Sequence, residues 1–312
     1  MRTDSNLTAL RWDARGLNNG LIFRATYQGV TRLPRRCSYA IGHVGTWLAY
    51  RFMRDGTAAL VENLRVVRPE ATERQLEALA LLTYRTYAKD TIDFIRSLEM
   101  DRSQIASFVI ERHSERLEEL LSRRRGVILV GGHFGNWELG GVVLRLLNGH
   151  RMTVIAKEEA SQVVAAFRRR MRESLGIETL EIGRMLETSL QIRRLLAANC
   201  IVAMLVDRHI GRDRVRVRFF GRSVAFLRTP AMIAGLSGAA LLPAFMVRQA
   251  DGRFVGAFGD AITVDPTQPT EVSVQVATQA FADQLESQIR ANPHLWYQFY
   301  PYWRTESAED QD

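Results

Sequence analysis

The stretch VILVGGHFGNWELGG, Val127 to Gly141, joins a short apolar run to a glycine-rich turn and to the start of an amphipathic segment. Four consecutive apolar residues ending in glycines are typical of a buried strand that runs into a turn. The same pattern returns in three later segments: Met152 to Ala156, Ile177 to Ile182 and Cys200 to Asp207. Helical periodicity fills the intervals at 137–147, 161–175 and 185–198. Strands and helices that alternate with short connections indicate βαβ units and a largely parallel sheet.

The segments on either side of this block differ from it. Residues before about 100 show apolar positions at helical spacing, which predicts a helical N-terminal region. After residue 208 we expect strands at 215–220, 241–247 and 253–258, and an amphipathic helix at 272–289. The predicted fold class is therefore α/β, with a central, mostly parallel mixed sheet flanked by helices. Residues 1–110 are predicted to be the helical region and residues 111–312 one continuous α/β core.

The composition is that of a basic globular protein. Its 312 residues carry 42 Lys plus Arg against 34 Asp plus Glu, a net charge of +8. Only Lys89 and Lys157 are lysines, so almost all the positive charge is on arginine, whose planar guanidinium suits phosphate and carboxylate. Two distant cysteines, Cys37 and Cys200, exclude a disulfide framework and a Cys-rich zinc site. Without a nucleic-acid motif, the expected anionic partners are a lipid surface or an acidic protein or substrate, and no nucleic acid.

The arm at 17–53 interleaves aromatic and aliphatic residues with arginines. This mixture is typical of a segment that lies in a membrane interface. A helical hairpin that packs on the domain, with its arginines in water, is the alternative, and the pattern does not decide between them. The apolar runs at 38–50 and 236–247 are shorter than the roughly 20 residues that a spanning helix needs.

His133 is the candidate reactive residue, because it follows a predicted strand and lies among glycines that leave room for a substrate. Imidazole titrates near neutrality, so His133 can act as a general base. Glu138 lies five residues on, in the first turn of the predicted helix, and is expected to fold back to the second imidazole nitrogen. A purely structural histidine is the alternative. Neither a zinc site nor a nucleotide-binding loop is expected, since the ligand spacing and the glycine pattern do not match.

GGHFGNWELGG resembles the catalytic block of the lipid A late acyltransferases, the lauroyl and myristoyl transferases of the lysophospholipid acyltransferase superfamily. Three more segments are similar to that family, in the family's order: Asn63-Leu64, Val206 to Ala234 and Asn292 to Arg304. The resemblance covers roughly residues 17 to 304. The phosphatidylinositol mannoside acyltransferases of actinobacteria belong to the same family.

The resemblance implies a set of site residues. It makes His133 the catalytic base and Glu138 its acidic partner, and it implies substrate-binding roles for Asn136, Arg172, Asp207 and Arg208. The arginine is not unique, because Arg168, Arg169 and Arg170 share the helix of Arg172. Two positions depart from the family pattern, Arg208 in place of glutamine and Lys157 in place of arginine, and both bear on the acceptor headgroup.

The resemblance implies transfer of a fatty acyl chain from a thioester, on acyl-carrier protein or CoA, to a hydroxyl of a glycolipid or phospholipid. We expect direct transfer without an acyl-enzyme, because no Ser or Cys lies where it could act as a nucleophile. We expect no metal or cofactor. The basic run at 208–218 could bind a phosphate headgroup or an acidic carrier protein. The alternative is that its arginines form the solvated face of an edge strand. The expected location is the cytoplasmic face of the cell (inner) membrane. Alternatives are a phosphatidylinositol mannoside acyltransferase, a non-catalytic peripheral lipid-binding protein and a thioesterase.

Overall fold

The structure is a computed structural model that describes residues 27–156, 169, 171–182, 185–268 and 270–303. The chain divides into two compact units. The first comprises Met1–Glu99, Glu158–Met171 and Asn292–Asp312, and the second comprises Met100–Lys157 and Arg172–Ala291. The division at residue 110 expected from the sequence stays a prediction.

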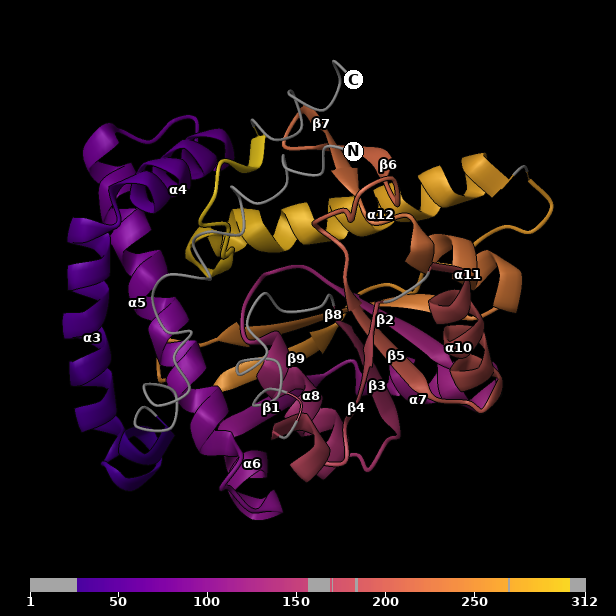
Figure 1. Cartoon of the computed structure of the whole chain (residues 1–312), viewed down its shortest axis with the longest axis horizontal. Coiled ribbons are helices and arrows are strands. Elements are labelled where there is room, and N and C mark those ends of the chain that lie inside the picture. The colour runs from indigo at the N-terminus through magenta and orange to yellow at the C-terminus, as the bar shows by residue number, and fades with distance from the viewer. Residues whose placement is uncertain (1–26, 157–168, 170, 183–184, 269, 304–312) are drawn as a thin grey trace, which may run out of the picture. The chain divides into compact units, whose positions relative to one another are not determined.

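The second unit is built on a seven-stranded sheet (Figure 1). In chain order the strands are β1 (Val109–Arg112), β2 (Val127–Gly131), β3 (Met152–Ala156), β4 (Glu178–Glu181), β5 (Ile201–Leu205), β8 (Ala240–Arg248) and β9 (Phe254–Phe258). Their order across the sheet is β1-β9-β8-β2-β5-β3-β4, and within it only the β8–β9 pair is antiparallel. The predicted α/β class with a mostly parallel mixed sheet is confirmed.

Helices cover both faces of this sheet. They are α6 (Arg102–Phe108), α7 (Ser114–Ser122), α8 (Trp137–Leu146), α10 (Met185–Ala197), α11 (Thr229–Ser237) and α12 (Thr270–Ala291). Leu117 and Leu120 of α7 and Leu144 of α8 share one hydrophobic core with Val127 and Leu129 of β2. The connections out of β2 and β5 run in opposite directions along the sheet, so right-handed crossovers place α8 and α11 on opposite faces. The carboxyl ends of β2 and β5 therefore border a topological switch point, where α/β sheets bind ligands.

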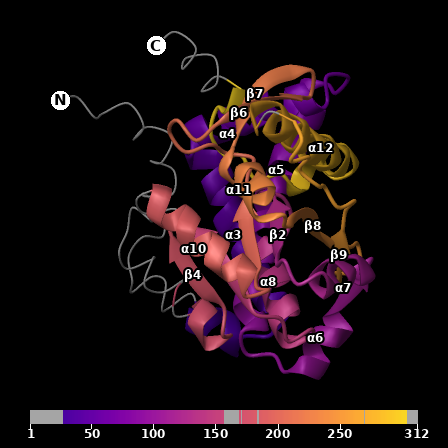
Figure 2. The ribbon, with the colours of Figure 1, turned by 90° about the vertical axis from the view of Figure 1, so that its right-hand side faces the viewer.

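Two strands differ from the sequence prediction. The strand β1 was not expected, because the four residues of Val109–Arg112 alternate in burial and form no apolar run. The segment predicted at 215–220 does not join the main sheet, but forms β6 (Val215–Phe219) of a separate hairpin with β7 (Arg222–Phe226). Phe220 and Gly221 both have positive φ, which a two-residue hairpin turn requires. The hairpin lies beside α12 (Figure 2).

The first unit contains α3 (Arg35–Phe52), α4 (Arg54–Val67), α5 (Glu73–Ser97) and the short 3-10 helix η1 (Pro293–Leu295). Asn63 on α4 fixes the aromatic segment that follows η1. Its Nδ2 donates to the carbonyls of Gln298 and Tyr300 at 2.9 and 2.7 Å, and its Oδ1 accepts from the Tyr302 N–H at 3.1 Å. Two of the segments that resemble the acyltransferase family thus contact each other, and the buried aromatic side chains among them pack as core.

Helix α3 packs along α5. A Cβ on Gly42 would lie 2.9 Å from Ile92 Cδ1, so glycine allows the two helices to approach closely. Arg35 binds the fully buried Asp93 through two hydrogen bonds of 2.9 Å. No helix among the described residues is long and apolar enough to cross a membrane. The part of the predicted interfacial arm before residue 27 lies outside the described residues.

Candidate active site

The strand order brings His133 and Asp207 together. Gly131, at the end of β2, pairs with Leu205, at the end of the neighbouring parallel strand β5 (Figure 1). His133 and Asp207 each lie two residues beyond these paired positions, at the same edge of the sheet. His133 and Asp207 are 74 positions apart in the sequence, and they lie side by side because β2 and β5 are neighbouring strands.

Asp207 holds His133 at two points. Its Oδ2 accepts the His133 backbone N–H at 2.9 Å, and its Oδ1 lies 2.7 Å from the imidazole Nδ1. The Asp207 side chain is 0% exposed and that of His133 is 21% exposed, so the carboxylate is buried while the ring reaches the surface. This is the arrangement by which a carboxylate fixes the tautomer of a catalytic imidazole.

The charge state of Asp207 determines that tautomer. Burial on its own raises the pKa of the Asp207 carboxyl, but the charge and hydrogen bonds of His133, and then the charge of Arg208, hold that pKa below its ordinary value. The carboxylate is therefore ionised at neutral pH and can only accept hydrogen bonds. Nδ1 of His133 consequently carries the proton, and Nε2 presents its lone pair.

Two glycines shape the turn around His133. A Cβ on Gly132 would lie 2.8 Å from Leu285 Cδ2 and 3.3 Å from Asp207 Oδ2. Gly135 has a φ of +64°, and a Cβ there would lie 2.1 Å from the carbonyl oxygen of Met246. A side chain at Gly135 would displace the turn from the Met246 backbone, and one at Gly132 would press on the Leu285 side chain and the Asp207 carboxylate.

Glu138 has a different partner from the one expected. Its carboxylate accepts from Arg172, with Nη2 to Oε1 at 2.6 Å and Nε to Oε2 at 3.4 Å. The two side chains are 23% and 12% exposed, so the ion pair is largely shielded from water. The expectation that Glu138 holds the second nitrogen of His133 is corrected: Asp207 contacts Nδ1. The reason is that β2 and β5 are neighbouring strands, which places Asp207 next to the imidazole, whereas Glu138 lies in the first turn of α8.

The other predicted site residues lie near this centre in different roles. Asn136 is the N-cap of α8: its Oδ1 accepts from Leu139 N, and its own N–H donates to Met246 O at 2.9 Å. Arg208 is half-buried next to Asp207. Arg169 is exposed, and Lys157, Arg168 and Arg170 lie outside the described residues. Of the arginines considered for the site, the structure thus shows Arg172 in contact with another predicted site residue.

Trp137 is a neighbour of the imidazole that sequence reasoning did not single out. Its ring meets that of His133 edge to face, with centroids 5.5 Å apart and an interplanar angle of 68°. The signal was present, since Trp137 belongs to the quoted block. Leu285 of α12 and Met246 of β8 contact the turn. They are distant from it in the sequence, so no local pattern around His133 could identify them. Within the described ranges, no cluster of three His, Cys, Asp or Glu side chains could hold a metal ion.

Residues 19–305 match the family described as bacterial lipid A biosynthesis acyltransferase. The chain belongs to this family. It is also similar to proteins named phosphatidylinositol mannoside acyltransferase. One, from Mycolicibacterium smegmatis, is 25% identical over 291 residues, which cover 93% of this chain and 92% of that protein. Another, from Mycobacterium tuberculosis H37Rv, is 30% identical over 199 residues, 63% of this chain and 60% of that protein.

The acyltransferase therefore has an acyl donor and a lipid acceptor as its substrates. Its resemblance to the lipid A late acyltransferases, stated from four sequence segments, is confirmed by the family match.

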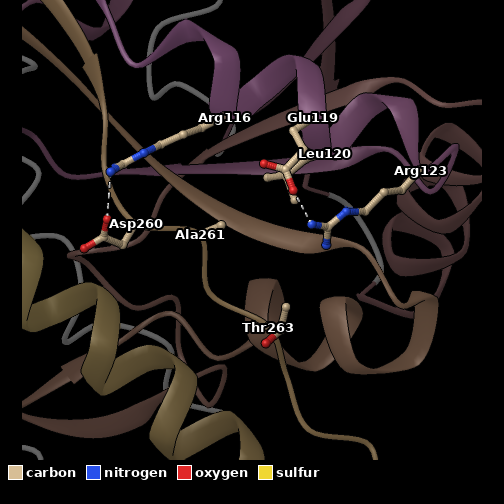
Figure 3. Close-up of a pocket in the computed structure, with 7 residues that line it drawn as sticks. All are labelled: Arg116, Glu119, Leu120, Arg123, Asp260, Ala261 and Thr263. Carbon is tan, nitrogen blue, oxygen red and sulfur yellow. Dashed lines mark hydrogen bonds and ion pairs between the residues drawn. The ribbon is translucent and has the colours of Figure 1, made fainter.

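The acyltransferase has a cavity of about 310 Å³ between α7 and the segment after β9, at the end of the sheet opposite to His133 (Figure 3). Its lining residues are Arg116, Glu119, Leu120, Arg123, Asp260, Ala261 and Thr263. The Arg116–Asp260 pair at 3.0 Å and the Arg123–Glu119 pair at 2.7 Å neutralise both arginines. This cavity lies near the start of β2, whereas His133 follows the end of that strand.

Proposed function

We propose that this acyltransferase moves a fatty acyl chain directly from a thioester to a hydroxyl of a membrane glycolipid, with His133 as general base and Asp207 as the residue that orients it. The observation that carries this proposal is the two-point contact between the Asp207 carboxylate and His133, at 2.9 and 2.7 Å. Such a contact leaves Nε2 as the basic atom, at a surface-accessible edge of the sheet.

The chemistry follows from that atom. The Nε2 lone pair takes the proton of the acceptor hydroxyl while the hydroxyl oxygen attacks the thioester carbonyl carbon. A C–O bond forms, and the carbonyl electrons move onto oxygen as an oxyanion. When the oxyanion collapses, the C–S bond breaks and the thiolate leaves with the electron pair, then takes the proton from the imidazolium. Ester and thiol are the products, and the ionised Asp207 stabilises the imidazolium between the two steps.

We assign Arg172 to substrate binding and Glu138 to its positioning. The ion pair uses Nη2 and Nε of the guanidinium, so the fork is fixed in direction by the carboxylate. A fixed guanidinium can hold an anionic oxygen of a substrate, such as a phosphate of the acceptor or donor. Arg208 and Asn136 support the site through the electrostatics of Asp207 and the start of α8.

For the acceptor we favour a mannosylated phosphoinositide over a lipid A precursor, because the similar curated proteins are named phosphatidylinositol mannoside acyltransferases. Purified protein would be incubated with radiolabelled acyl-carrier protein or acyl-CoA and each acceptor in turn. Labelled acylated mannoside is the expected product. Labelled lipid A precursor would overturn the choice of acceptor, free fatty acid would indicate a thioesterase, and no reaction with lipid binding would indicate a non-catalytic protein.

The direct mechanism has its own test. A denaturing gel of enzyme mixed with labelled thioester and no acceptor should show no protein-bound label. A stoichiometric covalent acyl group on the chain would refute direct transfer.

We also propose that α3 docks the enzyme on the cytoplasmic face of the cell membrane. Large apolar side chains on α3 are exposed in the described structure, among them Val44 at 62% and Phe52 at 74%, and they recur at helical spacing: Ile41, Val44, Leu48 and Phe52, with Trp47 beside them. Arginines flank this stripe at Arg36, Arg51 and Arg54. Apolar and aromatic residues with arginines on one exposed helix face suit an anionic bilayer surface.

Vesicle flotation tests the docking. Trp47→Ser with Phe52→Ser should reduce binding to anionic vesicles at least tenfold, because burial of two such side chains contributes about 3 kcal/mol or more. Val272→Ser with Val276→Ser removes exposed apolar residues from α12 and is the matched control. Equal flotation of both variants would exclude α3 as the docking surface.

A further inference from the structure

Three basic side chains meet where α3 packs along α5 (Figure 1). A Cβ on Gly42 would lie 3.8 Å from the Ala88 Cβ, so this part of α3 faces the middle of α5. His43 is the next residue of α3, and Arg85 and Lys89 lie one turn apart on the facing part of α5. Burial, and then the charges of Lys89 and Arg85, lower the pKa of the His43 imidazole. The three groups are therefore close enough to repel one another when all are charged.

Two atoms of this basic cluster (His43, Arg85 and Lys89) have no hydrogen-bonding partner in the part of the chain that the structure describes. They are His43 Nε2 and Arg85 Nε, and the protein encloses both. The Lys89 Nζ lies 5.5 Å from the centre of the Tyr39 ring, one turn before His43 on α3. All three basic side chains are half-buried, so each is partly shielded and partly open to solvent. A bound anion would supply the acceptors that the two enclosed nitrogens lack.

The acidic side chains in this part of α5 bind other residues. Asp93 accepts two hydrogen bonds of 2.9 Å from the Arg35 guanidinium. Asp90 accepts the Tyr297 hydroxyl at 2.6 Å, and both carboxylates are buried. A guanidinium can only donate hydrogen bonds, and neither carboxylate provides the acceptor that Arg85 Nε lacks. An acceptor from outside the described residues is needed to satisfy it.

The basic cluster borders the exposed apolar stripe of α3. Trp47 lies one turn after His43 on the same side of the helix and is 53% exposed, and Val44 is 62% exposed. Tryptophan is enriched at the depth of the lipid headgroups, which is also the depth of their phosphates. An acidic segment of a protein would account for the cations but not for the apolar side chains beside them. The surroundings of the cluster therefore favour a bilayer as the source of the anion.

We infer that His43, Arg85 and Lys89 form a binding site for the phosphate group of a membrane phospholipid. This inference deepens the docking proposal and rests on it, because it names the lipid group that α3 meets at the bilayer. Arg85 Nε donates to one phosphate oxygen, and Lys89 adds its charge. The imidazole donates from Nε2 once it is protonated, which a neighbouring phosphate favours. None of the three residues belongs to the candidate active site.

The first measurement uses the full-length protein and glycerophosphoinositol, the water-soluble headgroup of phosphatidylinositol. NMR of the histidine imidazoles follows the titration, and His43→Gln identifies the His43 signal. The signal should shift saturably, and the pKa of His43 should rise by about one unit, because the phosphate favours the charged imidazole. Arg85→Gln with Lys89→Gln should abolish this response. Without the headgroup, the same double variant should raise the pKa of His43, since two positive charges are removed.

The second measurement is flotation with phosphatidylcholine vesicles that do or do not contain phosphatidylinositol. Arg85→Gln with Lys89→Gln should lower binding to the phosphatidylinositol vesicles by about 5- to 30-fold, the loss expected when one or two basic side chains leave an anionic surface. If the double variant does not fold, Arg85→Gln alone should weaken the affinity for glycerophosphoinositol by about fivefold.

The matched control is Arg36→Gln with Arg51→Gln, which removes two exposed arginines from α3 but leaves the basic cluster intact. Its vesicle binding should fall in proportion to the lost surface charge, and this loss should be smaller at high salt. Its His43 signal should respond to glycerophosphoinositol as in wild type. A loss of that response in the control would show diffuse attraction in place of a site and would overturn the inference.

The remaining outcomes separate the phosphate site from the docking proposal. No response of His43 to glycerophosphoinositol, or an equal response in the double variant, would overturn the site even if α3 docks on vesicles. An equal response to inorganic phosphate, with unchanged flotation of the double variant, would assign the cluster to free phosphate and overturn the lipid assignment. If flotation depends on Arg85 and Lys89 but not on Trp47 and Phe52, the site stands and the apolar docking proposal fails.

Discussion

Replacing Asp207 by asparagine is the most informative single substitution at the site. Asn keeps the volume but has one acceptor oxygen, whereas the carboxylate accepts both the His133 N–H at 2.9 Å and Nδ1–H at 2.7 Å. If the amide oxygen keeps the backbone N–H, the NH₂ faces Nδ1. The imidazole then moves its proton to Nε2, and the atom that should take the hydroxyl proton becomes a donor.

The expected decrease in kcat is large because the substitution changes the tautomer of His133, while the turn that holds the ring stays intact. In a comparable His–Asp arrangement, carboxylate-to-amide substitution lowers kcat on the order of 10⁴-fold. We expect a decrease of about 10³- to 10⁴-fold here, equivalent to about 4–5.5 kcal/mol of transition-state stabilisation. KM should change by no more than a few-fold. Loss of a buried charged hydrogen bond should also lower the free energy of unfolding by about 1.5–3 kcal/mol.

The assay is initial-rate transfer from labelled thioester at saturating acceptor, with thermal unfolding measured in parallel. Asp213→Asn is the matched control: it lies in the same loop, and its carboxylate accepts the Thr229 N–H but does not contact His133. It should keep its rate within about threefold while losing about 1 kcal/mol of stability. If Asp207→Asn keeps more than a tenth of the wild-type kcat, the assignment of the imidazole's partner is refuted.

The same variant tests the pH dependence. The pKa of Asp207 in the folded protein lies below its ordinary value of 3.8. Ionised Asp207 therefore stabilises the fold above that value, and the contribution is lost as the pH falls through the lower folded-state pKa. Wild type should lose unfolding free energy below pH 4 more steeply than Asp207→Asn. Parallel curves would contradict the depressed pKa.

Three further predictions concern local geometry. Gly135→Ala should cost about 3–5 kcal/mol of stability, because both the positive φ and the contact of a Cβ with a carbonyl oxygen penalise alanine. Gly149→Ala, with a similar φ but open space around its Cβ, should cost about 1–2 kcal/mol. Equal losses in chemical denaturation would refute the steric argument. Gln substitutions of Glu138 and Arg172 should show a coupling of about 1–3 kcal/mol in a double-mutant cycle of kcat/KM, and additive effects would show that the ion pair does not position the guanidinium. Asn63→Ala should lower the free energy of unfolding by about 3 kcal/mol, since two buried backbone hydrogen bonds and one part-buried one are lost. A loss below about 1 kcal/mol would contradict that role.

The strands with the clearest sequence signal are the two central ones, which are buried on both faces of the sheet. Val127–Gly131 and Ile201–Leu205 read as continuous apolar runs because helices cover them on both sides. Val109–Arg112 was missed because it is a four-residue edge strand with alternating burial. A strand was predicted at 215–220, but its pairing with β7 in a separate hairpin was missed, because Phe220 takes a positive φ that its residue type does not indicate.

Sequence reasoning located the turn around His133 but not the carboxylate that contacts the imidazole. Glycines around His133 mark the turn, and this signal is local. Which carboxylate meets the imidazole depends on β5 being inserted between β2 and β3, and strand order is not written in local spacing. Local reasoning therefore favoured Glu138, five residues away, over Asp207, 74 residues away.

The central claim is that His133 takes the acceptor proton in a direct acyl transfer. The most direct measurement is a single-turnover assay of labelled thioester with the mannosylated acceptor, comparing wild type with His133→Ala at matched folded concentration. We expect labelled acylated lipid from wild type and a rate lower by at least about 10³-fold in His133→Ala, with donor and acceptor affinities within a few-fold. Acyl transfer by His133→Ala at a near-normal rate would contradict it.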